Sequence, residues 1–97
     1  MYQTEFSPES LEDLRLFRKF DAKRIFEEIE TQLAHQPEQE TRNRKRLRPN
    51  KLAEWELRIG DFRVFYEVDV DNAIVKIVAV GYKEGNKFFI RGEEYEL

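Results

Sequence analysis

Residues 55–66 read WELRIGDFRVFY, and this stretch decides the fold. Apolar and polar residues alternate on both sides of Gly60-Asp61, a dipeptide typical of the two-residue turn in a β-hairpin. A turn of this length fixes the register and pairs Arg58 with Arg63. Because directly opposed residues project from the same face of a sheet, the two arginine side chains are predicted to lie next to each other.

The predicted arginine pair needs a compensating charge, because like charges opposite each other destabilise a hairpin. Glu56 is the diagonal neighbour of Arg63 in this register and offers a purely structural ion pair. Alternatively, the pair binds an anion such as an RNA phosphate, which arginine holds well in a forked geometry. The residues alone leave both interpretations open. Trp55 and Tyr66 lie on the opposite, apolar face and are predicted to be core residues.

Two helices are predicted before the hairpin. Ser7 suits the N-cap of the first helix, and apolar residues then recur at helical spacing, with Asp13 among the charged residues that face outward. Asp21 is predicted to cap a second helix with one apolar side. This helix should end just before Pro37, because the residue preceding a proline disfavours the helical conformation. The two helices form a helical hairpin.

The remaining segments predict strands and one loop. Residues 2–6 read as a short first strand, residues 37–50 lack apolar periodicity and are predicted to be a loop, and residues 87–91 read as a final strand before an acidic tail. One α+β domain over residues 1–97 is therefore predicted. Its N-terminal strand and helical hairpin pack on a twisted antiparallel β-sheet of four to five strands.

A second hairpin is predicted at Asp71-Asn72, and the apolar run that follows this turn is typical of a central strand with both faces covered. The turn pairs Glu67 with Lys76, which is a favourable opposite-charge pair. It also pairs Val64 with Ala79 on the core face. Both predicted registers keep the apolar residues on one face, which supports them.

The composition excludes several classes of site. The chain has 97 residues, no cysteine and a single histidine, His35, so a thiolate nucleophile and a Cys/His zinc site are excluded. No metal and no cofactor are expected. The absence of cysteine favours a reducing cytoplasm, and the sequence contains no apolar run long enough to span a membrane. His35 lies near the end of the second predicted helix, where interaction with the helix dipole is the expected role.

Positive charge is concentrated in the middle of the chain. The net charge is −3, yet residues 41–63 carry eight bases and three acids. Six bases fall within ten residues: Arg42, Arg44, Lys45, Arg46, Arg48 and Lys51. Such a segment either contacts RNA, where each neutralised phosphate strengthens binding, or is a solvated loop that interacts with acidic parts of the same chain.

Residues 55–66 resemble the central motif of the RelE/ParE superfamily of toxins from bacterial type II toxin–antitoxin systems. Residues 75–83, which read VKIVAVGYK, resemble the strand that follows this motif in the family. The resemblance implies a toxin with a cognate antitoxin as its partner. RelE-like members of the family cleave mRNA on the ribosome, whereas ParE-like members share the fold and poison DNA gyrase.

The resemblance also implies roles for three residues. Arg63 matches the family's phosphate-binding arginine, and Arg58 matches a frequent basic neighbour. Lys83 stands where the RelE-like nucleases often carry an arginine. In metal-independent RNA cleavage, such cations stabilise the charge that develops on the phosphate while other groups move protons. Arg63, Arg58 and Lys83 are therefore the catalytic candidates, and the six bases of the central segment are the RNA-binding candidates.

Three positions depart from the nuclease pattern. Glu54 and Glu56 stand where the best-known ribonucleases carry lysines, and Phe89 falls near the place of their catalytic tyrosine. Either glutamate offers a general base beside Arg63. The first functional hypothesis is a RelE-like mRNA endoribonuclease that inhibits translation. The alternatives are a non-nuclease ParE-like toxin that binds gyrase or another protein, and a degenerate relative that only binds its antitoxin.

Overall fold

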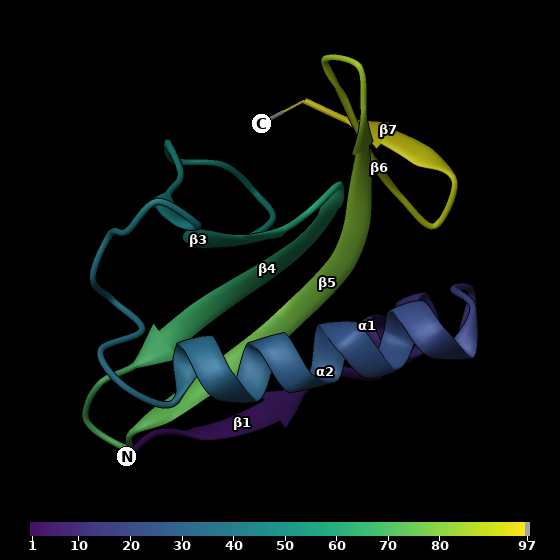
Figure 1. Cartoon of the computed structure of the whole chain (residues 1–97). Helices are drawn as coiled ribbons and strands as arrows, with labels where there is room; N and C mark the ends of the chain where they lie inside the picture. The colour runs from purple at the N-terminus through teal and green to yellow at the C-terminus, as the bar shows by residue number, and fades with distance from the viewer. Residues whose placement is uncertain (97) are drawn as a thin grey trace.

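A helical hairpin covers one face of a mixed, strongly twisted β-sheet in the computed structural model, which describes residues 1–96 (Figure 1). The predicted α+β class is confirmed. The elements in chain order are β1 (Gln3–Phe6), α1 (Pro8–Arg15), α2 (Lys19–Leu33), β2 (Arg44–Arg46), β3 (Trp55–Ile59), β4 (Phe62–Asp69), β5 (Ile74–Glu84), β6 (Lys87–Ile90) and β7 (Glu93–Tyr95).

The sheet contains more strands than predicted. The described residues form seven strands in the order β2-β3-β4-β5-β6-β7, with β1 paired to β5, whereas four to five were predicted. β2 lies inside the predicted loop of residues 37–50, and β7 lies inside the predicted acidic tail. Both are three-residue edge strands without apolar alternation, so no periodic signal marks them. The pairing of β1 with β5 is parallel, so the sheet is mixed.

The register of the central hairpin is confirmed. β3 and β4 pair with Arg58 opposite Arg63 and Trp55 opposite Tyr66. The two aromatic rings stack with centroids 6.1 Å apart, and both residues are buried beneath the helices. The Tyr66 hydroxyl donates a hydrogen bond of 3.0 Å to the carbonyl of Pro37, which anchors the chain after α2.

The second hairpin follows the predicted register only in part. Glu67 pairs with Lys76 as predicted, but the register shifts by one residue at a bulge in β5, where Val78 is the extra residue between the partners of Phe65 and Tyr66. Val64 therefore pairs with Val80 and not with the predicted Ala79. Such a bulge bends β5 and increases its twist, and no glycine or turn residue at this point of the sequence predicts it.

The boundaries of α2 differ from the prediction at both ends, since it begins at Lys19 and ends at Leu33, before the predicted end next to Pro37. Ser7 is the N-cap of α1, and its hydroxyl accepts a hydrogen bond of 3.0 Å from the Ser10 amide, as predicted. α2 begins at Lys19, so Asp21 is not its cap but lies in its first turn and pairs with Arg18 at 3.1 Å. A carboxylate is stabilised anywhere in the first turn by the helix dipole, which explains the wrong assignment.

The prediction that Asp13 faces solvent is wrong. Its side chain is 1% exposed, because α1 packs directly on β5. One carboxylate oxygen accepts a hydrogen bond of 2.9 Å from the amide of Val80, and the other pairs with Arg91 in the turn between β6 and β7. Charged residues are usually exposed, and the sequence near Asp13 does not indicate its partners, because they lie far away in the chain.

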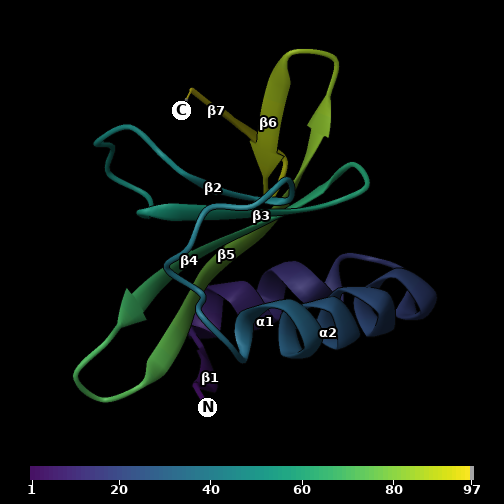
Figure 2. The same cartoon turned by 60° about the vertical axis from the view of Figure 1, so that its left-hand side comes forward.

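Apolar side chains cover both faces of the sheet. The larger cluster lies between the helices and the sheet. A smaller cluster on the opposite face contains Ala53, Phe65, Ala79 and Ile90, and Leu47, Leu52 and Phe88 pack around it. Figure 2 shows the β2–β3 loop and the β6–β7 hairpin on this second side, opposite the helices. In the described part of the chain, no helix is long and apolar enough to cross a membrane.

Candidate functional site

The predicted arginine pair lies on the second face of the sheet, at the turn end of the β3–β4 hairpin. The two side chains differ in accessibility, since that of Arg58 is 44% exposed and that of Arg63 is only 9% exposed. Arg58 therefore presents its guanidinium to solvent, whereas Arg63 is enclosed by the hairpin that carries it.

Arg63 uses its donors within the protein. One terminal nitrogen, Nη1, donates to the carbonyls of Gly60 at 2.7 Å and Phe62 at 2.9 Å. The buried Nε atom has no hydrogen-bond partner among the described residues. Burial lowers the pKa of Arg63 from its ordinary value, although the attraction of Glu56 acts in the opposite direction. An arginine nonetheless stays protonated, so a full positive charge sits in a poorly hydrated place.

Glu56 supplies the counter-charge for both arginines. Its side chain is 2% exposed, and its carboxylate lies 3.1 Å from Nε of Arg58 and 3.7 Å from Nε of Arg63. This is the structural ion pair between Glu56 and the arginines that the predicted register allowed. The three residues, Glu56, Arg58 and Arg63, are called the arginine–glutamate cluster below. Buried charged side chains such as these are stable only when each lies beside an opposite charge.

Lys83 projects from the same face as the cluster. Gly81 pairs with Arg63, and Lys83 lies two residues further along β5, so the alternation of the strand places both on one side. The Lys83 ammonium lies 6.0 Å from the centroid of the Phe88 ring, and its amide donates to the Asp61 carbonyl at 2.8 Å. The structure thus brings the third catalytic candidate near the hairpin turn.

Phe89 does not lie on the face of the arginines. It pairs with Tyr82 across β5 and β6, and the two rings stack with centroids 5.4 Å apart. Tyr82 in turn pairs with Phe62, which belongs to the apolar cluster under the helices. The hydroxyl of Tyr82 is therefore on the side of the sheet opposite the arginine–glutamate cluster, and Phe89 has no proton to exchange.

One of the six central bases has a structural role that sequence reasoning missed. Nη1 of Arg44 donates to three carbonyls at the carboxyl end of α2, those of Gln32 at 2.9 Å, Gln36 at 3.0 Å and His35 at 3.2 Å. These groups have no partner within the helix, and a cation there also opposes the helix dipole. Arg44 lies well beyond the end of α2 at Leu33, so no local capping signal in the sequence marks this role.

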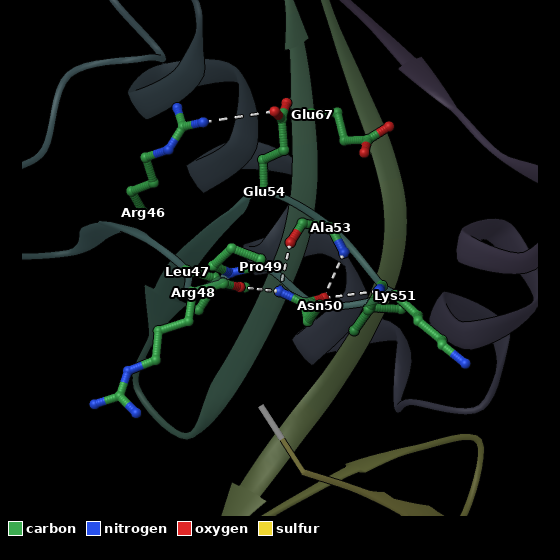
Figure 3. Close-up of a pocket in the computed structure, with 10 residues that line it drawn as sticks. Arg46, Leu47, Arg48, Pro49, Asn50, Lys51, Ala53, Glu54 and Glu67 are labelled. Carbon is green, nitrogen blue, oxygen red and sulfur yellow. Dashed lines mark hydrogen bonds and ion pairs between the residues drawn. The ribbon is translucent and has the colours of Figure 1, made fainter.

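The other central bases point outward. Arg42, Lys45, Arg46, Arg48 and Lys51 are all exposed. The segment borders a shallow pocket of about 270 Å³, and Figure 3 shows the side chains of Arg48 and Lys51 leaving it in opposite directions. Arg46 turns back to Glu54 at 3.6 Å and lies 5.6 Å from the Trp55 ring. The cations therefore form a dispersed basic surface and do not converge on one point.

Asn50 fixes the shape of this segment. Its side-chain oxygen accepts from the amides of Leu52 at 2.7 Å and Ala53 at 3.0 Å, and its side-chain nitrogen donates to the carbonyls of Arg48 and Ala53 (Figure 3). The hydrogen bonds of this one side chain therefore hold the backbone between Arg48 and Ala53 in place. The described residues contain no group of three potential ligands that could hold a metal ion.

Comparisons with known proteins agree with the fold. A family model described as the ParE toxin of the type II toxin–antitoxin system, parDE, matches residues 4–86. The crystal structure of the toxin–antitoxin complex RelBE2 from Mycobacterium tuberculosis matches with a TM-score of 0.73 and 23% identity, covering 84% of this chain and 98% of that chain. No curated protein matches the sequence at a significant level.

An archaeal RelE–RelB complex from Pyrococcus horikoshii OT3 has the same fold, with a TM-score of 0.65, 21% identity and coverage of 81% of this chain and 91% of that chain. The predicted superfamily resemblance is confirmed by these matches. The matched residues 4–86 end one residue before β6, so the β6–β7 hairpin lies outside the family model.

Proposed function

The chain belongs to the ParE family of toxins from type II toxin–antitoxin systems, and from this premise we propose that it inhibits DNA gyrase by binding and does not cleave RNA. The family match spans most of the chain, which makes a toxin role the starting point. The choice between the two activities of the superfamily then depends on the chemistry that the second face of the sheet can perform.

The burial and the hydrogen bonds of Arg63 are the main support for this proposal. A phosphate-binding arginine must offer free N–H groups to a ligand, yet Arg63 is 9% exposed and donates to two backbone carbonyls of its own hairpin. Its charge and that of Arg58 are already opposed by the buried carboxylate of Glu56. An incoming phosphodiester would have to displace contacts inside the protein before it gained any.

The proton-transfer groups of a ribonuclease are also missing from the expected places. Cleavage by the ribose 2′-hydroxyl requires a base, an acid and cations that stabilise the phosphorane. Glu56 holds two arginines, and Glu54 pairs with Arg46 at the edge of the sheet. Phe89 replaces a titratable side chain with an aromatic ring that stacks on Tyr82. These contacts favour binding over catalysis.

An antitoxin is the expected partner of a toxin from such a system. The exposed bases Arg42, Lys45, Arg48 and Lys51 present a positive surface that suits an acidic segment of that protein. Binding would be strongest at low ionic strength, because exposed charges are screened by salt. Co-expression with the neighbouring reading frame, followed by co-purification at increasing salt, measures this contact directly.

The RelE-like alternative retains one specific observation in its favour. Arg58 is 44% exposed, and Lys83 projects from the same face of the sheet, so these two cations remain available to a phosphate. Under this alternative the partners are mRNA and the ribosome. Replacing both Arg58 and Lys83 with alanine would then abolish RNA cleavage, while Arg15→Ala on the exposed side of α1 would not.

The decisive experiment measures both activities of the same protein. The toxin is induced in cells, cut sites on translated mRNA are mapped, and supercoiling by purified gyrase is assayed with the purified chain. Intact mRNA together with blocked supercoiling is the expected result. Cleaved mRNA with normal supercoiling would establish the nuclease alternative, and a chain that binds its antitoxin without any toxicity would establish a degenerate relative.

A further inference from the structure

A second pocket lies on the helix side of the sheet, away from the arginine–glutamate cluster. It has a volume of about 300 Å³ and is formed by the end of α1, by β5 and by the turn that joins β6 to β7. This volume is at the lower end of the range for pockets that bind small ligands, so it suits one large side chain. Most of the lining side chains are apolar or aromatic, and they include Leu16, Phe17, Tyr82 and Phe89, together with Arg91.

Two large apolar side chains of the α1–α2 turn are exposed to solvent. Leu16, which also lines the pocket, is 69% exposed, and Phe20 at the start of α2 is 77% exposed. Among the described residues, only Met1 is a more exposed large apolar side chain than these two. Exposed apolar residues that are grouped, and not scattered singly, are typical of protein–protein contacts. The α1–α2 turn and its pocket therefore favour a protein as the ligand.

The wall of the pocket that comes from the β6–β7 turn is fixed in place. Arg91 has a φ of +51°, a conformation that costs free energy for a residue with a side chain. Its guanidinium pairs with the buried carboxylate of Asp13, which holds the turn against α1 (Figure 1). The rings of Tyr82 and Phe89 stack on each other beside it. A pocket with walls held in this way needs little ordering when a ligand binds.

Positive charge surrounds the exposed leucine. Residues 14–20 read LRLFRKF, so the α1–α2 turn carries three bases and no acid. Arg15 and Arg18 are exposed and pair with carboxylates one turn away at 3.2 and 3.1 Å. Exposed ion pairs of this kind contribute little to stability, so their cations can also pair with carboxylates of another protein. The charge of the turn therefore complements an acidic segment.

We propose that this pocket is the docking site for the protein target of the toxin. The docking segment of the target carries one large apolar side chain flanked by carboxylates. The apolar side chain fills the pocket beside Leu16 and the stacked rings, and the carboxylates face the bases of the α1–α2 turn. This inference rests on the proposed function, since it names the surface through which a binding toxin engages its target.

Two observations favour the target over the antitoxin as the occupant. The basic segment of residues 42–51, which suits an acidic antitoxin, contributes no residue to this pocket. Phe89 and Arg91 lie outside residues 4–86, the part of the chain that matches the family model. The pocket is therefore not contained in the matched region and can serve a contact that is particular to this chain.

The test is the variant Leu16→Glu, which places a carboxylate where the acidic segment should dock. The concentration that half-inhibits supercoiling by gyrase should rise about tenfold or more, and induction of the variant should no longer stop growth. Val70→Glu is the matched control, because Val70 is an apolar residue that is 60% exposed in the turn between β4 and β5. This control should inhibit supercoiling and growth as the wild type does.

A second variant, Leu16→Lys, tests the charge of the partner. It removes the same apolar contact but adds a positive charge, so it should retain more inhibition than Leu16→Glu. Because Leu16 is exposed, both variants should melt within about 3 °C of the wild type and should still co-purify with the antitoxin. If Leu16→Glu does not fold, the loss of inhibition in Leu16→Lys relative to Val70→Glu decides the outcome.

Full inhibition by a folded Leu16→Glu would overturn the proposal, as would an equal loss in Val70→Glu. A greater loss in Leu16→Lys than in Leu16→Glu would overturn the acidic character of the segment. Loss of antitoxin binding with retained toxicity would assign the pocket to the antitoxin. If the wild type stops growth without inhibiting gyrase, the proposed target is wrong, and the growth assay of the same variants still decides the pocket. A wild-type chain without any toxicity would overturn both proposals.

Discussion

Asp13 and Arg91 form an ion pair, although 78 residues separate them in the sequence. The same carboxylate accepts a hydrogen bond from the amide of Val80 on β5. One buried side chain therefore holds α1, the central strand and the turn between β6 and β7 together. Removal of Asp13 leaves the buried amide of Val80 unsatisfied, and removal of Arg91 leaves the buried carboxylate without its counter-charge, which makes this a site of large mutational effects.

We predict that Asp13→Ala lowers the free energy of unfolding by about 2–3 kcal/mol, because it leaves the buried Val80 amide without its acceptor and removes the ion pair with Arg91. Urea denaturation followed by circular dichroism measures the change. Glu12→Ala, one residue earlier on the exposed side of α1, is the matched control and should shift stability by about 0.5 kcal/mol or less. Equal effects of both substitutions would show that the contacts of Asp13 with Val80 and Arg91 do not stabilise the fold.

Arg44 and Arg42 separate structural from binding roles within the basic segment. Arg44→Ala should destabilise the protein by about 1.5–3 kcal/mol, because it removes the cation that satisfies three carbonyls after α2. Arg42→Ala should leave stability almost unchanged, since its side chain is exposed. Thermal unfolding of the two variants tests this, and an unchanged Tm for Arg44→Ala would show that the cap is dispensable.

Tyr66 should make stability fall at alkaline pH. Burial raises the pKa of its phenol well above the ordinary value, and Glu38 acts in the same direction while Arg44 opposes it. Below pH about 10 the phenol is protonated in both states, and its contribution is complete. As the pH rises further, the unfolded chain loses this proton more readily than the folded one, so the contribution is lost progressively toward the folded pKa.

The matching variant is Tyr66→Phe, which also removes the hydrogen bond to the Pro37 carbonyl. It should cost about 1 kcal/mol at neutral pH and should show a shallower loss of stability above pH about 10. Chemical denaturation across a pH series measures both effects. Identical alkaline slopes for the variant and the wild type would refute the assignment to Tyr66.

Gly81 is predicted to be intolerant of any side chain. A Cβ atom there would lie 2.2 Å from the Phe89 carbonyl oxygen and 2.9 Å from a methylene carbon of Ile90, so β6 would have to move. Gly81→Ala should cost about 2–3 kcal/mol and loosen the β6–β7 hairpin, as hydrogen exchange would reveal. Gly85→Ala, in open space but with a φ of +63°, should cost only about 1 kcal/mol.

Local patterns in the sequence predicted the central hairpin well. A two-residue turn and strict alternation were enough to pair Arg58 with Arg63, and the Glu67–Lys76 pair followed from the second turn. The bulge at Val78 in β5 was not predictable, because it depends on how β4 and β5 twist together. The register of a hairpin can therefore be predicted from sequence where the turn residues and the alternation of apolar residues indicate the same pairing.

Long-range contacts limited the prediction of the site. Glu56 was recognised as a neighbour of Arg63, but nothing in the sequence indicated that it is almost completely buried on the face where side chains of the β2–β3 loop and the β6–β7 hairpin also pack. Asp13 was assigned to solvent because its partners come from β5 and the last turn. The residues next to a charged side chain on a helix give no indication that it has a partner 78 residues away.

The parallel pairing of β1 with β5 determines when the sheet can form as the chain is synthesised. Ser7 binds Val78 across 71 residues, and Gln3 lies opposite Ile74, so the first strand leaves the ribosome long before its partner exists. Contacts this distant in sequence slow folding, because a large loop must close before they form. The parallel pair of β1 and β5 can therefore form only after β5 has been synthesised, and a nascent chain that stops before Ile74 lacks the partner of β1.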